Sequence, residues 1–250
     1  MDVDFIKEGK IFLKILAVDT SASVASAAVM EDSKLLGEYT VNHKKTHSQK
    51  LMPMIKELME SLELIPTDID IYAASIGPGS FTGLRIGVTT IKSIAFASAK
   101  PVISVPTLDA LALNIPLTES LVCPLMDARN NQVYTALYKR EKGRQVKITE
   151  YMGIKIDELI ELIQGKNHKV VFVGDGVYLH GDELKCKLGE YCEIAPGSLL
   201  LQRASSVAQA GLMMAAEGRV ESCFEMVPFY LRKSQAEREL ERKEALQTIL

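Results

Sequence analysis

The stretch GPGSFTG, residues 77–83, places a serine in a glycine-rich turn between an apolar run and a helix-forming segment. A serine at a strand-to-helix turn is typical of hydrolases in which a sharp elbow exposes the nucleophile. The glycines here depart from the GxSxG order, and no histidine and aspartate can be assigned as partners of Ser80. We therefore expect Ser80 or Thr82 to cap the following helix. The predicted glycine turn consists of Gly77, Gly79, Ser80, Gly83 and Arg85.

Two histidines, His43 and His47, are the candidates for a metal site, because a spacing of four would place both on one face of a helix. His43, however, precedes the expected helix start at Thr46 or Ser48, and no glutamate follows it as in a zinc peptidase motif. The four cysteines form no CxxC pair, so zinc and redox motifs are not expected either. The sequence predicts no metal site.

The elements that must position these residues begin with an antiparallel meander. Strands are expected at residues 14–19, 25–30 and 35–40, followed by a helix at 48–62, a strand at 69–75, a helix at 82–99, a strand at 101–106 and a short helix at 108–114. This order, βββαβαβα, is that of a ribonuclease-H-like or actin-type half-domain.

The pattern then repeats. Strands are expected at residues 121–127, 132–139, 146–152, 169–174 and 191–195, with helices at 156–164 and 182–188. The openings LAVDTSASVASAAVM and CPLMDARNNQVYTALY both read as apolar strand, aspartate, polar turn and apolar strand, which internal duplication explains. A helix at 199–217 is expected to return to the first unit. We predict a duplicated α/β protein of two actin-like lobes, residues 1–115 with 199–232 and residues 116–198, and a charged tail at 233–250.

Duplicated actin-type halves usually hold a nucleotide between them, in turns whose glycines let backbone N–H groups approach the phosphates. Neither polar turn here contains a glycine, and Arg129 is bulky where a glycine would be expected. Two interpretations stay open, a weak ATP site and a cleft retained for packing. The residues of this degenerate cleft are Asp19, Thr20, Ser21, Asp127, Arg129, Gly174, Asp175 and Gly176.

The chain has 250 residues and a net charge of −3 at pH 7, and we find no run dense in lysine and arginine. We therefore expect any contact with nucleic acid to be made mainly by a partner. The first residues do not form a secretory signal, and no segment approaches the length needed to span a bilayer. A cytoplasmic protein with reduced thiols is expected.

The stretches ILAVDTSASVASAAVM, HSQKLMPMI, SIGPGSFTGLRIGVTTIKSIAFA, VISVPTLDALA, PLMDARNNQVYTALY and VPFYLR resemble the TsaB (YeaZ) family of bacterial tRNA threonylcarbamoyladenosine biosynthesis proteins, over about residues 14–232. The resemblance implies an actin-like fold and a non-catalytic partner of the related subunit TsaD and the ATPase TsaE. Their assembly transfers a threonylcarbamoyl group to N6 of the adenosine 3′ of the anticodon in tRNAs that read ANN codons. The tRNA would be met only through the complex.

The family's catalytic relative TsaD holds its metal partly through an HxxxH pair, and the resemblance places Thr107 and Leu111 at those positions. Neither binds a divalent metal usefully. No intrinsic cofactor is implied, and ATP or ADP would bind weakly or at the partner interface, if at all. The alternative from the residues is a stand-alone ATP-dependent phosphotransferase or a metallopeptidase of the actin-like superfamily.

The resemblance also implies that the TsaD contact is made by the first two helices, here residues 48–62 and 82–99, whose same face can build a homodimer. The second of these helices is apolar on more than one side, which fits this role. Each side chain could instead belong to the core of its own lobe, and both alternatives stay open. The predicted contact residues are His47, Leu51, Met54, Ile55, Leu58, Met59, Leu84, Val88, Ile91 and Ala95.

Overall fold

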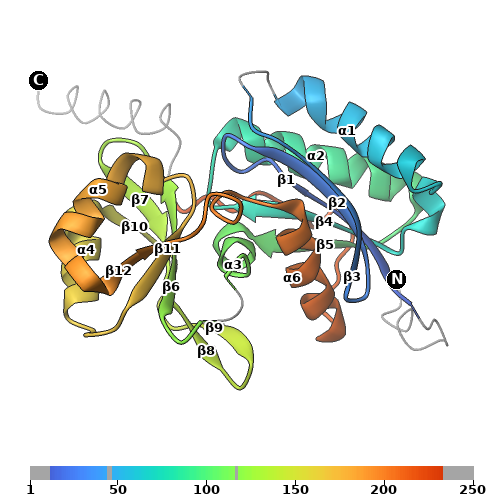
Figure 1. Ribbon diagram of the computed structural model, residues 1–250. Helices are drawn as coiled ribbons and strands as arrows, with labels where there is room; N and C mark the ends of the chain where they lie inside the picture. The colour runs from blue at the N-terminus through green and yellow to red at the C-terminus, as the bar shows by residue number, and fades with distance from the viewer. Residues whose placement is uncertain (1–11, 44–46, 116–117, 233–250) are drawn as a thin grey trace, which may run out of the picture.

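A computed structural model describes residues 12–43, 47–115 and 118–232, which fold into two α/β lobes that lie side by side (Figure 1). Among these residues, none of the helices combines the length and the apolar character that crossing a membrane requires. The charged tail predicted at residues 233–250 and the candidate cap Thr46 lie outside the described residues.

The first lobe is built on a five-stranded sheet in the order β3-β2-β1-β4-β5. Its strands are β1 (Lys14–Asp19), β2 (Ala25–Glu31), β3 (Lys34–Val41), β4 (Ile71–Gly77) and β5 (Val102–Pro106). The first three strands are antiparallel, and β4 and β5 run parallel to β1. Helices α1 (His47–Ser61) and α2 (Phe81–Ser98) cover one face of this sheet, and a 3-10 turn, η2 (Pro66–Asp68), lies between α1 and β4 (Figure 1).

The second lobe repeats this arrangement around a sheet whose main path is β10-β7-β6-β11-β12. Its elements are β6 (Leu121–Asp127), β7 (Gln132–Thr135), β10 (Met152–Lys155), α4 (Ile156–Gln164), β11 (Val170–Val173), α5 (Val177–Leu188), η3 (Gly189–Tyr191) and β12 (Cys192–Ile194). Strand directions match those of the first lobe position by position, with β7 and β10 antiparallel and β11 and β12 parallel. The predicted duplicated actin-like fold is confirmed.

Two expected strands of the second lobe are wrong in detail. The strand expected at 132–139 is interrupted after β7, which ends at Thr135, and continues as β8. The strand expected at 146–152 is divided between the end of β9 and the start of β10. The chain forms a hairpin here, with strands β8 (Tyr138–Glu141) and β9 (Arg144–Lys147). At the interruption, the Leu137 N–H donates to the Thr149 hydroxyl oxygen over 2.9 Å, and the Ile148 N–H donates to the Leu137 carbonyl over 2.8 Å. Beyond the interruption, β8 pairs with β6 through Tyr138 and Val122, so the hairpin stays attached to the seven-stranded sheet but leaves the β10-β7-β6-β11-β12 path.

The helix that follows each sheet packs against the other lobe. Helix α3 (Thr107–Ala112) follows the first sheet, yet Leu108 and Leu111 belong to the core of the second lobe. Helix α6 (Ala204–Ala216) follows the second sheet and packs on the first, on the face opposite α1 and α2 (Figure 1). The helix expected at 199–217 is shorter at its start because the Asn114 amide donates to the carbonyls of Leu199 and Leu201, which holds residues 199–203 outside the helix.

The N-terminus of α6 is capped by distant strands rather than by neighbouring residues. The Ala204 N–H donates to the Ser26 hydroxyl oxygen over 3.0 Å, and the Ser205 N–H donates to Glu38 Oε1 over 2.9 Å. The other oxygen of Glu38 accepts from Arg203 Nη2 over 2.6 Å. A carboxylate at this position also interacts favourably with the positive end of the helix dipole. Glu38 on β3 therefore fixes where α6 begins.

We expect Glu38→Ala to lower the free energy of unfolding by about 2 kcal/mol, because the amide of Ser205 and the guanidinium of Arg203 lose a charged acceptor. Equilibrium unfolding in urea measures this difference. Glu217→Ala is the matched control, since Glu217 pairs with Arg219 at the surface and its removal should cost less than about 1 kcal/mol. Equal effects of the two substitutions would contradict the capping role of Glu38.

Candidate functional site

The first polar turn of the predicted cleft, formed by Asp19, Thr20 and Ser21, makes its hydrogen bonds within the first lobe. Asp19 is 1% exposed, and its Oδ1 accepts hydrogen bonds from the Ser21 N–H over 2.8 Å and from the Ser21 hydroxyl over 2.6 Å. Its Oδ2 accepts from the Ser75 hydroxyl over 2.6 Å. Burial raises the pKa of Asp19, and these three hydrogen bonds oppose the shift. Both carboxylate oxygens are thus occupied within the lobe.

The glycine turn packs directly against this polar turn. The Ser80 N–H donates to the Ser21 carbonyl over 2.7 Å, and the Thr20 hydroxyl donates to the Gly83 carbonyl over 2.7 Å. A Cβ atom on Gly83 would lie 2.0 Å from the Thr20 carbonyl oxygen, and one on Gly79 would lie 2.4 Å from the Ser21 carbonyl oxygen. These glycines therefore let two backbone segments approach each other.

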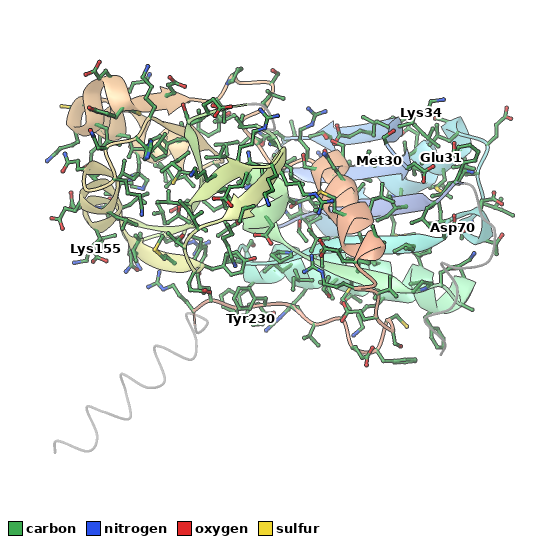
Figure 2. The ribbon with its side chains drawn as sticks, turned by 90° about the horizontal axis from the view of Figure 1, so that it is seen from below. Met30, Glu31, Lys34, Asp70, Lys155 and Tyr230 are labelled. Atoms are coloured by element: carbon green, nitrogen blue, oxygen red, sulfur yellow. The ribbon has the colours of Figure 1, made fainter. Side chains whose placement is uncertain are left out.

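Ser80 is the N-cap of α2, as predicted, and its hydroxyl oxygen accepts from the Gly83 N–H over 3.3 Å. The other two residues of the predicted turn contact the C-terminal segment. Gly77 has φ 133°, and a Cβ there would lie 2.1 Å from the Phe229 carbonyl oxygen. Arg85 Nε donates to the Tyr230 hydroxyl over 2.9 Å, and Figure 2 shows Tyr230 where the C-terminal segment passes between the lobes.

The second polar turn is open to solvent. Asp127 is exposed, and its Oδ1 accepts from the Arg129 N–H over 2.7 Å. Arg129, Asn130 and Asn131 all adopt left-handed backbone angles, with φ of 61°, 54° and 56°. Because side chains rarely adopt this conformation, the turn keeps a shape for which glycines would be the usual residues. The Arg129 side chain is exposed.

Asp175 lies beside this second turn, between two glycines that pack on the end of β6. A Cβ on Gly174, whose φ is 122°, would lie 2.3 Å from the Leu125 carbonyl oxygen. Burial raises the pKa of Asp175 to about 6; the Gln202 side chain and the Asp127 backbone oppose the shift, while the Asp127 carboxylate adds to it. Within the described residues, Asp175 Oδ1 and both polar atoms of the Gln202 amide make no hydrogen bond of good geometry.

The candidate metal ligands are engaged elsewhere or separated. His47 Nε2 lies 2.8 Å from the Ala22 carbonyl oxygen, which can only accept, so this nitrogen carries the proton. In the part of the chain that the structure describes, no group of three or more histidine, cysteine, aspartate or glutamate side chains could hold a metal ion. Thr107 is buried and accepts from the Gly77 N–H over 3.1 Å, and Leu111 packs in the second core.

The predicted contact residues on α1 and α2 face inward in the single chain. Nine of them are at most 7% exposed, and all of these except Met54 and Leu84 pack in one core with Leu16 and Val29: Leu51, Met54, Ile55, Leu58, Met59, Leu84, Val88, Ile91 and Ala95. Burial of these nine in the single chain favours the alternative that they belong to the core of their own lobe. His47, at the start of α1, is partly exposed.

A groove of about 620 Å³ runs along the outer side of the two helices. Met52 on α1 is 49% exposed, and Ile65, after α1, is 60% exposed. No charged residue lines the groove, which we call the α1–α2 groove. The sequence carried a signal for it, namely small residues on α2 that permit close approach. Its lining is formed by Met52, Ile65, Pro66, Thr67, Thr89, Thr90, Ser93, Ile94, Ala97 and Ser98.

Known proteins resemble this chain over most of its length. A family model described as tRNA N6-adenosine threonylcarbamoyltransferase, TsaD, matches residues 34–240. The protein named tRNA threonylcarbamoyladenosine biosynthesis protein TsaB from Bacillus subtilis (strain 168) is 32% identical over 225 residues, which cover 90% of this chain and 96% of that relative. The TsaB protein of Escherichia coli (strain K12) is 29% identical over 237 residues, covering 93% and 100%.

Among solved structures, YeaZ from Pseudomonas aeruginosa matches with a TM-score of 0.73 and 23% identity, over 88% of this chain and 100% of that one. A second structure from the same organism, described as an uncharacterized protein with similarity to peptidase YEAZ, matches with a TM-score of 0.76 and 24% identity, over 88% and 100%. At these identities the likeness concerns the fold.

We expect Gly83→Ala to destabilise the first lobe by about 3 kcal/mol, because the new methyl group would overlap the Thr20 carbonyl and force α2 away from the Asp19 turn. Gly197→Ala is the control, since a Cβ there meets nothing within 4 Å. Thermal and urea unfolding of both variants measure the difference. A Gly83→Ala protein as stable as the control would show that the close packing is not required.

We expect stability to rise as the pH falls from 8 to 5 through a contribution of Asp175. Its raised pKa means that the folded protein takes up a proton near pH 6, whereas the unfolded chain does so only near pH 4. The gain is fully present below the unfolded pKa, where it reaches about 2–3 kcal/mol, and is lost as the pH rises through about 6; about 1.4 kcal/mol of it falls between pH 5 and pH 8. Asp175→Asn should remove this part of the pH dependence and be more stable than wild type at pH 8.

Urea unfolding at pH 5 and pH 8 checks this expectation. Asp182→Asn is the matched control, because Asp182 is an exposed aspartate on α5 and should leave the pH dependence as in the wild type. If Asp175→Asn kept the full pH dependence, Asp175 would not be the responsible group.

Proposed function

The chain belongs to the TsaB (YeaZ) family, and we propose that it acts in the biosynthesis of threonylcarbamoyladenosine in tRNA as a non-catalytic subunit. In this proposal it binds a TsaD homologue as a heterodimer, supports its conformation and helps the TsaE homologue to dock. The chain forms a homodimer through the same face when alone, and it meets tRNA only within the assembly. ATP or ADP has at most a weak or interfacial site. The assembly would act on the adenosine 3′ of the anticodon in ANN-decoding tRNAs.

The observation that carries the proposal is the α1–α2 groove. An uncharged, partly apolar groove between two exposed helix faces suits the packing of further helices, and methionine and small side chains adapt to more than one partner. The match to a model of the TsaD family supports a partner of similar architecture, which would present an equivalent pair of helices. An interface of standard size buries about 800 Å² on each side, more than the groove alone supplies, so neighbouring positions of α1 and α2 would contribute.

The closed first turn supports the non-catalytic part of the proposal. The side-chain oxygens of Asp19 and Thr20 are already used inside the lobe, and Thr107 and Leu111 are buried where the resemblance places the metal ligands of TsaD. A chain arranged in this way would need a partner to supply the reacting groups. Threonylcarbamoyl transfer or rapid ATP hydrolysis by the isolated chain would contradict this part.

We expect the double substitution Met52→Asp and Ala97→Asp to weaken binding of the TsaD homologue at least tenfold, because each places a carboxylate without a partner in a desolvated interface. Both positions are exposed, so the lobe should stay folded. Calorimetry and size-exclusion chromatography of the mixed subunits measure the effect. Leu58→Asp would be a poor test, because Leu58 is 1% exposed and the variant would lose its own core.

The matched control is Tyr178→Asp with Leu179→Asp on α5 of the second lobe, where both side chains are 65% exposed. This pair introduces the same charge at exposed apolar positions away from the groove, and it should leave the complex intact. An undiminished complex with the Met52 and Ala97 variant would exclude the α1–α2 groove as the contact surface.

A further inference from the structure

The β8–β9 hairpin distinguishes the second lobe from the first. In the first lobe, β2 and β3 connect directly through Asp32 and Ser33. In the second lobe, the corresponding connection between β7 and β10 is extended by β8 and β9, and the hairpin projects from the lobe on the side away from α1 and α2 (Figure 1). Its two-residue turn, Lys142 and Gly143, has φ of 49° and 81°, as tight hairpins require.

The hairpin is strongly basic in a chain that is not. Residues 138–147 contain five basic side chains and one acidic side chain, a net charge of +4, whereas the whole chain carries −3. The expectation that the sequence holds no dense basic run is therefore wrong for residues 139–144, KREKGR, in which four of six residues are basic. Such a local concentration creates a positive field that the net charge conceals.

One face of the hairpin holds it against the body of the protein. The Tyr138 hydroxyl donates to Asp109 Oδ1 on α3 over 2.5 Å, and the Gln145 amide donates to the Ile115 carbonyl over 2.7 Å. The Asp109 carboxylate also accepts from the Tyr151 hydroxyl over 2.8 Å, and Lys147 Nζ lies 3.4 Å from the centre of the Tyr151 ring. The hairpin is thus held in place before any ligand binds.

The opposite face presents its cations to solvent. Because side chains alternate along a strand, Lys139 and Arg144 point away from the anchored face, and both are exposed, as is Lys142 at the turn. Lys139 lies 3.9 Å from Glu141, with both side chains 52% exposed, a pair worth less than about 1 kcal/mol. Within the described residues, Lys142 and Arg144 have no ion pair.

We propose that the outer face of the β8–β9 hairpin, formed by Lys139, Lys142 and Arg144, binds the phosphate backbone of the RNA substrate within the assembly. This inference rests on the proposed function and names the part of this chain that touches tRNA. Three cations on a rigid ribbon can each neutralise a phosphate, but they are too few for tight binding by a chain of net negative charge. Contact with RNA would therefore be seen when partner subunits supply the remaining contacts.

Phosphate fits this face better than an acidic protein surface does. A specific protein interface needs a desolvated core with aromatic or aliphatic anchors. The exposed apolar side chains nearest to the cations are Val146 and Ile148, each only 38% exposed. Its position also favours RNA, since the hairpin projects on the side of the molecule away from the α1–α2 groove and stays free when that groove is occupied (Figure 1).

The test compares two triple variants of the full chain in the assembly with its TsaD and TsaE homologues. The hairpin variant is Lys139→Gln, Lys142→Gln and Arg144→Gln. The control is Lys166→Gln, Lys185→Gln and Lys187→Gln, which removes the same charge near and on α5. Binding of an unmodified ANN-decoding tRNA transcript is followed by fluorescence anisotropy between 50 and 200 mM salt, and size-exclusion chromatography shows whether each assembly forms.

We expect the hairpin variant to assemble normally and to bind the tRNA about 10- to 100-fold more weakly near 100 mM salt, with the slope of log affinity against log salt reduced by about 2. The control should stay within twofold of wild type. An unchanged affinity and slope, or an equal loss in the control, would overturn the proposal. A hairpin variant that fails to assemble would instead assign the hairpin to a protein contact, whereas failure of the wild-type chain to assemble would count against the proposed function itself.

Discussion

The first lobe depends on a close backbone contact between the start of α2 and the turn that follows Asp19. It exists because residues 79 and 83 have no side chains, and it brings the Thr20 and Ser21 carbonyls to distances that no other residue type would permit at those positions. The contact sets how α2 lies on the sheet. It thereby decides which side of the helix is buried against β4 and which side faces outward into the α1–α2 groove. It also engages the Thr20 hydroxyl, which donates to the Gly83 carbonyl.

The second lobe keeps the same topology but treats the equivalent turn differently. Gly174 and Gly176 pack on the end of β6, while Asp127 stays exposed and Asp175 is partly buried beside the amide of Gln202. In the first lobe the polar turn at Asp19 is therefore buried by packing against α2. In the second lobe the equivalent turn, with three residues in left-handed backbone conformation, lies at the surface. Duplication preserved the order of strands, whereas the turns at their ends diverged because the sheets tolerate different loops.

The lobes are joined by more than their connecting chain. α3 places Leu108 and Leu111 in the second core, α6 covers the first sheet, and the Phe229 ring lies 5.9 Å from that of Tyr151. These crossings fix the position of the two candidate surfaces relative to each other, with the α1–α2 groove on one lobe and the basic hairpin on the other. A partner protein bound at the α1–α2 groove and an RNA bound at the hairpin would therefore contact two lobes whose relative position these contacts fix.

Composition and periodicity by themselves determined most of the strand and helix order, the duplication and the capping by Ser80, because each is written in residues close together in the chain. Only the tertiary structure decided that Leu51 and Ile91 face their own sheet while Met52 faces outward. An apolar stripe shows that a face is covered but not what covers it. The cap of α6 by Glu38, 167 residues from Ser205, and the anchoring of the basic hairpin to Asp109 and Ile115 likewise depend on contacts between distant segments, which local patterns do not encode.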